Sequence, residues 1–157
     1  MNSQLEFIGV SAFDNQIDQP IAASADKTVT FTPPEGETWQ ICGVYIQASD
    51  PSGSASGTHK IELLRGIASG AKTYYLRALA NTGNNIAIRN LQVQTADTSI
   101  PADTADQIHA LLNTWITNGN ALDVTYSNDT DVSQTANCPC RIIFKRYKTR
   151  YDSFEVL

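Results

Sequence analysis

Two histidines are the chain's candidates for general acid–base catalysis. His59 lies beside a Gly/Ser-rich loop, and His109 lies on the polar side of a segment with helical spacing. A catalytic base needs an oriented nucleophile as its partner. Neither histidine has a Gly-x-Ser-x-Gly segment or a companion Cys motif. We therefore expect both side chains to be exposed and to have no catalytic role.

Paired carboxylates perform glycoside hydrolysis, and two pairs of acidic residues are close in sequence: Asp103 with Asp106, and Glu35 with Glu37. Both pairs lie in turn or helix-start segments, where acidic side chains cap helices and solvate loops. The segment 128–131 (Asn-Asp-Thr-Asp) resembles part of a calcium loop but lacks the glycine and terminal glutamate of such a loop. We interpret it as a turn.

The three cysteines, Cys42, Cys138 and Cys140, form no disulfide or metal pattern. An odd count in a chain of 157 residues is not a disulfide framework. Cys138-Pro139-Cys140 lacks the two-residue spacer of a zinc knuckle, and no second Cys or His pair is near in sequence. Cys42 lies in an apolar run and is expected to be a small buried hydrophobe. The sequence therefore predicts no metal, no other cofactor and no enzymatic activity.

The charge is unevenly distributed along the chain. Residues 1–140 carry six basic and fourteen acidic side chains, a net charge of −8, whereas residues 141–157 carry five basic and two acidic ones, a net charge of +3. An acidic body argues against binding to nucleic acid, because phosphate contacts need a basic surface. The basic end suits an acidic partner surface, such as that of a neighbouring copy. A solvated tail is the alternative interpretation.

The chain contains no run of 18 apolar residues, so no transmembrane helix is predicted. Its first residues lack the basic and apolar regions of a secretory signal. We therefore expect it to stay in the cytoplasm or to leave inside an assembled particle.

Short segments of alternating apolar and polar residues predict an all-β fold. Seven are clear, and Pro-, Gly- and Asn-containing turns separate them; the predicted strands are 27–32, 39–48, 58–64, 72–79, 86–93, 121–126 and 141–147. Helices and strands do not alternate, which disfavours a parallel α/β fold. We expect an antiparallel two-sheet sandwich of jelly-roll type.

One segment, 103–116, has helical spacing and predicts a single short helix with Thr104 as its cap. The alternative keeps one helical turn, with Trp115 and Ile116 already extended. Trp39 and Trp115 both sit among apolar residues and are expected in the core.

The layout resembles the small β-sandwich decoration, or cement, proteins that coat the capsids of tailed bacteriophages. The similarity spans residues 26–147. It rests on the segment 33–39 (Pro-Pro-Glu-Gly-Glu-Thr-Trp), which leads into a strand, and on 115–128 (Trp-Ile-Thr-Asn-Gly-Asn-Ala-Leu-Asp-Val-Thr-Tyr-Ser-Asn). The resemblance implies a virion protein on the capsid surface, a major capsid protein as partner, a homotrimer and no catalysis.

We divide the chain into an N-terminal segment (1–25), a β-sandwich domain (26–147) and a C-terminal arm (148–157). The arm is the predicted partner-binding segment, because its apolar side chains would otherwise lie in water. The predicted partner-binding residues are Lys148, Arg150, Tyr151, Phe154, Val156 and Leu157. A disordered end is the alternative interpretation of this segment.

Two other functions remain open. One is a carbohydrate- or receptor-binding module that uses Tyr74 or Tyr75, which are adjacent on a strand, so that one of them faces away from the core. The other is a small enzyme whose active site forms between subunits.

Overall fold

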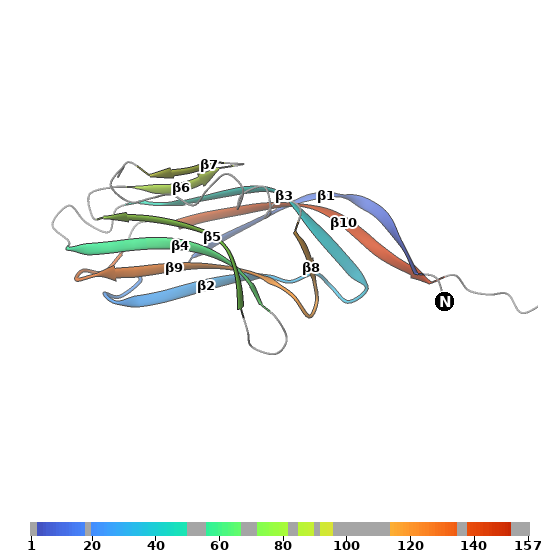
Figure 1. Cartoon of the computed structure of the whole chain (residues 1–157), viewed down its shortest axis with the longest axis horizontal. Coiled ribbons are helices and arrows are strands. Elements are labelled where there is room, and N and C mark those ends of the chain that lie inside the picture. The colour runs from blue at the N-terminus through green and yellow to red at the C-terminus, as the bar shows by residue number, and fades with distance from the viewer. Residues whose placement is uncertain are drawn as a thin grey trace, which may run out of the picture.

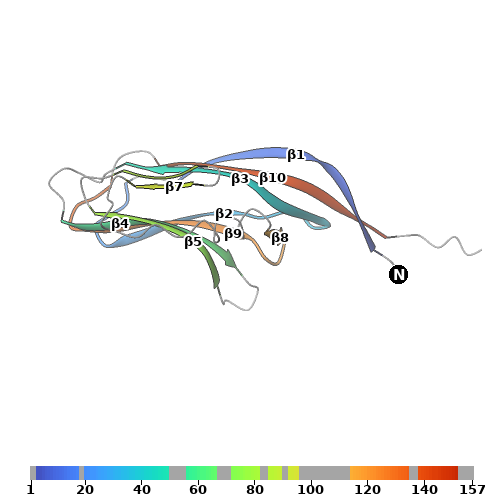
Figure 2. The same cartoon turned by 45° about the horizontal axis from the view of Figure 1, so that its top comes forward.

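The chain folds as two antiparallel β-sheets packed face to face, in a computed structural model that describes residues 3–17, 20–49, 56–66, 72–81, 85–89, 92–95, 114–134 and 138–151. The six-stranded sheet has the order β1-β10-β3-β6-β7, with β8 paired to β3, and the four-stranded sheet has the order β2-β9-β4-β5. The two layers are seen edge-on in Figures 1 and 2. The strands are β1 (Ser3–Ile17), β2 (Ala25–Phe31), β3 (Glu37–Ala48), β4 (Gly57–Gly66), β5 (Lys72–Asn81), β6 (Ile86–Arg89), β7 (Gln92–Thr95), β8 (Trp115–Thr117), β9 (Leu122–Thr130) and β10 (Cys138–Tyr151).

The chain crosses repeatedly between the two sheets. Strands β1 to β4 alternate between them, and so do β8, β9 and β10. Among the described strands, only β4–β5 and β6–β7 are consecutive in sequence and also pair within one sheet. Most strands that follow one another in the sequence therefore lie in opposite sheets, and their apolar faces pack together in a single core between the two sheets.

Alternating side chains from both sheets fill this core. Phe144 of β10 lies at its aromatic centre, with ring centroids 5.0 Å from Trp39, 5.8 Å from Phe13 and 6.0 Å from Phe31. Phe13 also stacks on Trp39 at 4.7 Å. The core thus ties β1, β3 and β10 of one sheet to β2 of the other.

A buried polar cluster closes the opposite end of the core. The amide nitrogen of Asn128 lies within hydrogen-bonding distance of the carbonyl oxygens of Ile21 (3.2 Å), Ala22 (3.1 Å) and Val132 (2.8 Å). Its amide oxygen accepts from the hydroxyl of Thr130 at 2.6 Å. Asn128 is fully buried, and it supplies hydrogen-bond partners to the backbone of two loops.

Two of the three β-bulges in the described strands lie in the long strands β1 and β3, and the third lies between β4 and β5. The register of β1 with β10 passes from Phe7–Tyr147 to Gly9–Arg146, which leaves Ile8 as an extra residue. In β3, Cys42 is the extra residue opposite β10. Gly9 has a φ of 142°, a conformation that side chains rarely adopt, so a glycine suits this bulge.

The predicted all-β, two-sheet antiparallel fold is confirmed, but several elements differ. No strand was predicted in 1–25, where β1 forms. The segment 86–93 is divided into two strands, β6 and β7. Strand β9 extends to Thr130, into the segment 128–131 that we expected to be a turn, and β10 reaches from Cys138 to Tyr151.

The predicted helix is not seen in the described residues. Residues 103–113 lie outside the part of the chain that the structure describes, and Trp115–Thr117 form strand β8. For Trp115 and Ile116, the extended alternative is therefore the correct one.

Candidate functional site

Strand β1 exposes an unusual number of apolar side chains. It is the edge strand of the six-stranded sheet, and in the described residues it pairs only with β10. Leu5, Phe7, Ile8 and Val10 are each between 42 % and 57 % exposed. Soluble proteins usually protect a long edge strand with charges, proline or a covering segment. An apolar edge of this length therefore indicates an interaction surface.

Aromatic side chains continue this surface across the sheet. The ring of Phe7 lies 5.5 Å from that of Tyr147, and the ring of Tyr147 lies 5.0 Å from that of Trp115. Tyr147 shares its face of β10 with Lys145, whereas Phe144 and Arg146 point inward. We call Leu5, Phe7, Val10, Trp115 and Tyr147 the apolar patch; it lies on the outer face of the six-stranded sheet.

A polar row crosses the same outer face nearer the other end of the sheet. Direct register partners place Asp14 of β1, Arg141 of β10, Tyr45 of β3 and Arg89 of β6 side by side. Arg141 and Asp14 form a two-pronged ion pair, with Nε–Oδ1 at 2.5 Å and Nη2–Oδ2 at 2.9 Å. The Arg141 hydrogen bond lowers the pKa of the Asp14 carboxyl. Arg89 Nη2 donates to Gln47 Oε1 at 3.1 Å.

A hollow of about 560 Å³ lies over this row, and Asn15, Gln47, Pro139 and Ile143 contribute to its walls. Tyr45 is 38 % exposed. Because the row rests on four paired strands, its side chains are held in fixed order and spacing.

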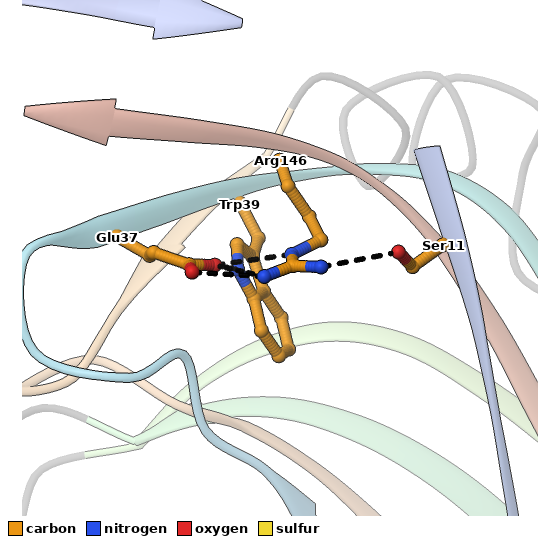
Figure 3. A network of polar contacts seen from close by, with 4 residues as sticks. All are labelled: Ser11, Glu37, Trp39 and Arg146. Carbon is orange, nitrogen blue, oxygen red and sulfur yellow. Dashed lines mark hydrogen bonds and ion pairs between the residues drawn. The ribbon is translucent and has the colours of Figure 1, made fainter. Parts of the chain in front are cut away.

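A network of polar contacts around an ion pair connects β1, β3 and β10 (Figure 3). The guanidinium of Arg146 binds the carboxylate of Glu37 with Nη2–Oε1 at 2.8 Å and Nε–Oε2 at 3.0 Å. The indole nitrogen of Trp39 donates to the same carboxylate at 2.7 Å. Arg146 Nη1 also donates to Ser11 Oγ at 3.4 Å. Burial alone would raise the pKa of Glu37, but the hydrogen bonds from Trp39 and Arg146 hold it below its usual value.

Glu37→Gln is expected to destabilise the protein by about 1–3 kcal/mol at neutral pH, because a charge-assisted pair is lost. A carboxyl whose folded pKa is lowered contributes stability above its unfolded pKa and loses it as the pH falls through the folded pKa. The difference in unfolding free energy between wild type and variant should therefore be constant near neutral pH and shrink below about pH 4.5. Urea unfolding across this range measures it. Glu35→Gln, at an exposed position two residues before β3, is the control. Wild-type and Glu37→Gln stabilities that differ by the same amount down to the lowest pH would contradict the assignment.

The predicted partner-binding residues divide into two groups. Lys148, Arg150 and Tyr151 form the end of β10, where Arg150 pairs with Glu6 of β1 and Lys148 stands opposite both Glu6 and Glu37. Phe154, Val156 and Leu157 lie outside the described residues. The charged members thus have acidic neighbours within their own chain.

The structure corrects three smaller expectations. His59, expected to be exposed, is fully buried, because it alternates inward with Ile61 and Leu63; its Nδ1 hydrogen-bonds the Tyr126 hydroxyl at 3.1 Å. Trp115, expected in the core, is 36 % exposed, whereas Trp39 is buried as predicted. Cys42, expected to be buried, is only partly so, since it lies at the β3 bulge.

The two remaining cysteines face the core. Cys138 and Cys140 alternate inward on β10, and burial raises the pKa of Cys138 to about 12 and that of Cys140 further still. Such thiols are poor nucleophiles and poor metal ligands. In the described ranges, no three His, Cys, Asp or Glu side chains are grouped to hold a metal ion.

The other sequence candidates do not come together. The segment 128–131, which we interpreted as a turn, is mostly strand, because its residues 128–130 belong to β9. Glu35 is exposed, apart from the paired Glu37. His109, Asp103 and Asp106 lie outside the described residues, as do the side chains of Tyr74 and Tyr75 in β5.

Sequence reasoning missed the apolar patch and the polar row, which both depend on β1. The signal available was the cluster of apolar residues in 5–13, which is typical of a strand. Comparison with protein-family models and with curated protein sequences found no match. In the described residues, no helix is long and apolar enough to cross a membrane.

Proposed function

We propose that the chain is a structural virion protein that decorates a bacteriophage capsid and bridges neighbouring capsid subunits. The observation that carries this proposal is the apolar patch on the outer face of β1, β10 and β8. When a partner covers apolar side chains that an edge strand leaves in water, the free energy falls by about 25 cal/mol for each Å² of apolar surface buried. The role needs neither a catalytic step nor a cofactor.

A jelly-roll fold is part of the proposal. The order β1-β10-β3-β6 within the six-stranded sheet and the order β2-β9-β4-β5 of the other sheet support it, because the chain repeatedly crosses between these two sets of four strands. The resemblance in layout to capsid decoration proteins points the same way, since jelly rolls are common in viral capsid proteins.

The partner-binding end would comprise the β1–β10 ribbon and the arm beyond it. Strands β1 and β10 run on together past the other strands at one end of the molecule (Figures 1 and 2). We propose that the patch contacts the major capsid protein and that Phe154, Val156 and Leu157 extend this contact. Arg150, which is ion-paired with Glu6, and Lys148, which lies opposite Glu6 and Glu37, would add electrostatic steering. A homotrimer is the proposed assembly, since closed symmetry satisfies one repeated interface in each copy.

The double variant Phe7→Ser/Val10→Ser tests this function. In lysates of the cells that naturally produce the chain, we expect the wild type to sediment with large particles and the variant to remain in the light fraction. The exposed substitution Gln4→Ser on the same strand is the control, and circular dichroism checks that all three fold. A wild-type chain that sediments only as a light species, and scatters light as a monomer at low and high salt, would overturn the proposal.

The second candidate function is a carbohydrate- or receptor-binding module on a phage particle. The hollow over Tyr45 favours it, because an exposed aromatic ring lies there among amide, carboxylate and guanidinium groups. Small-molecule sites are hollows of this kind, with a few convergent polar groups.

A further inference from the structure

We infer that the hollow over Asp14, Arg141, Tyr45 and Arg89 binds an acidic saccharide, with a sugar ring on Tyr45 and a carboxylate on Arg89. This inference deepens the second candidate function and rests on it. It does not depend on the capsid role, which uses a different part of the outer face.

The backbone sets the dimensions of this site. Four direct register partners on neighbouring strands form the row. Paired strands lie about 4.8 Å apart, so the backbones that carry Arg141 and Arg89, one on each side of Tyr45, are roughly 10 Å apart. That separation fits a saccharide of one or two rings lying across the strands. The volume of about 560 Å³ suits a ligand of that size.

The charge of the site favours an anion. Arg141 is neutralised by its two-pronged ion pair with Asp14. Arg89 hydrogen-bonds the uncharged Gln47, so its positive charge is not cancelled there. The row of Asp14, Arg141 and Arg89 therefore carries a net charge of +1. A local positive surface on a chain of net charge −5 attracts a single carboxylate, which guanidinium groups bind in two-pronged geometry.

The uncharged groups favour a sugar over an acidic peptide. The exposed ring of Tyr45 offers an apolar surface to the C–H groups of a pyranose, and its hydroxyl can hydrogen-bond. Gln47 supplies an amide that both donates and accepts, which suits the hydroxyls of a sugar. Pro139 and Ile143 complete the apolar part of the wall. An acidic peptide would use the guanidinium groups and depend little on the Tyr45 ring.

The inference is tested by titrating the full chain with 3′-sialyllactose, a hyaluronan tetrasaccharide and lactose, followed by calorimetry and NMR. At least one acidic saccharide should bind roughly tenfold or more tightly than lactose. Tyr45→Ala should weaken binding of that saccharide by roughly tenfold or more, and Arg89→Gln should remove the preference over lactose. Tyr147→Ala and Arg150→Gln are matched controls outside the hollow and should bind as the wild type does.

Each other outcome overturns a defined part of the inference. Equal binding of lactose and the acidic saccharides would leave a carbohydrate module and remove the acidic specificity. Binding of none of the three would overturn both this site and the second candidate function, without bearing on capsid attachment. Binding of a Glu-rich peptide that is unaffected by Tyr45→Ala, with no saccharide bound, would assign the hollow to a polypeptide.

Discussion

Asn128→Ala is expected to lower the free energy of unfolding by about 2–4 kcal/mol. The substitution removes hydrogen bonds from the carbonyl groups of Ile21, Ala22 and Val132 and from the Thr130 hydroxyl. Ile21 O still accepts from Gln134 N and Val132 O from the Thr130 hydroxyl, so the cost comes from several lost hydrogen bonds at about 1 kcal/mol each and from the space that alanine leaves empty. Urea unfolding followed by tryptophan fluorescence measures the change.

The neighbouring residue provides the control. Asp129 is exposed and forms a surface ion pair with Lys60, so Asp129→Ala should change stability by less than about 1 kcal/mol. Asn128→Asp keeps an acceptor for Thr130 but cannot donate, and it should be nearly as damaging as alanine. If the Asn128 and Asp129 variants were equally stable, the buried cluster would not hold the loops in place.

Phe144→Ala should destabilise the protein by about 3–5 kcal/mol, because it opens a cavity at the centre of the core. The ring contacts three other aromatic side chains from three different strands. For a chain of this length, such a loss lowers the Tm by roughly 6–20 °C. Differential scanning calorimetry and urea unfolding should agree on the change.

Two further variants distinguish the loss of the Phe144 ring volume from a general destabilisation of strand β10. Phe144→Leu fills most of the space and should cost less than half as much as alanine. Lys145→Ala, at the next residue and exposed, should change stability by about 0.5 kcal/mol or less. A loss below about 1 kcal/mol for Phe144→Ala would mean that the two sheets do not close around this ring.

The sequence alone predicted strands that have one buried and one exposed face. It did not predict the edge strand β1 or the buried polar residue Asn128. In β2, Val29 and Phe31 alternate with threonines, so local pattern and tertiary burial agree. In the first part of β1, Leu5, Phe7 and Val10 lie on the exposed side, whereas in the last part Phe13 and Ile17 face the core. Alternation along this strand therefore gives no reliable sign of its inner face. Asn128 looks like a turn residue by type; only its distant partners, Ile21 and Ala22, explain why it is buried in a strand.

The candidate site was out of reach for a different reason. Asp14, Tyr45, Arg89 and Arg141 are far apart in sequence, and only the strand order β1-β10-β3-β6 places them in one row. The strand order follows from which sheet each strand joins, a choice made by packing across the whole molecule. The exposure of Trp115 has the same origin, because β8 pairs at the end of β3 with its indole on the outer face.

The bulge at Ile8 reverses the phase of β1. After it, even-numbered residues such as Val10 and Asp14 point outward; before it, odd-numbered residues such as Leu5 and Phe7 do so. Uninterrupted pairing of the same sequence would turn Gln4, Glu6 and Ile8 outward and send Leu5 and Phe7 to the side of Trp39. The bulge therefore decides which side chains of this part of β1 face outward. With the extra residue Ile8, Leu5 and Phe7 lie on the outer face; without it, the carboxylate of Glu6 would lie there.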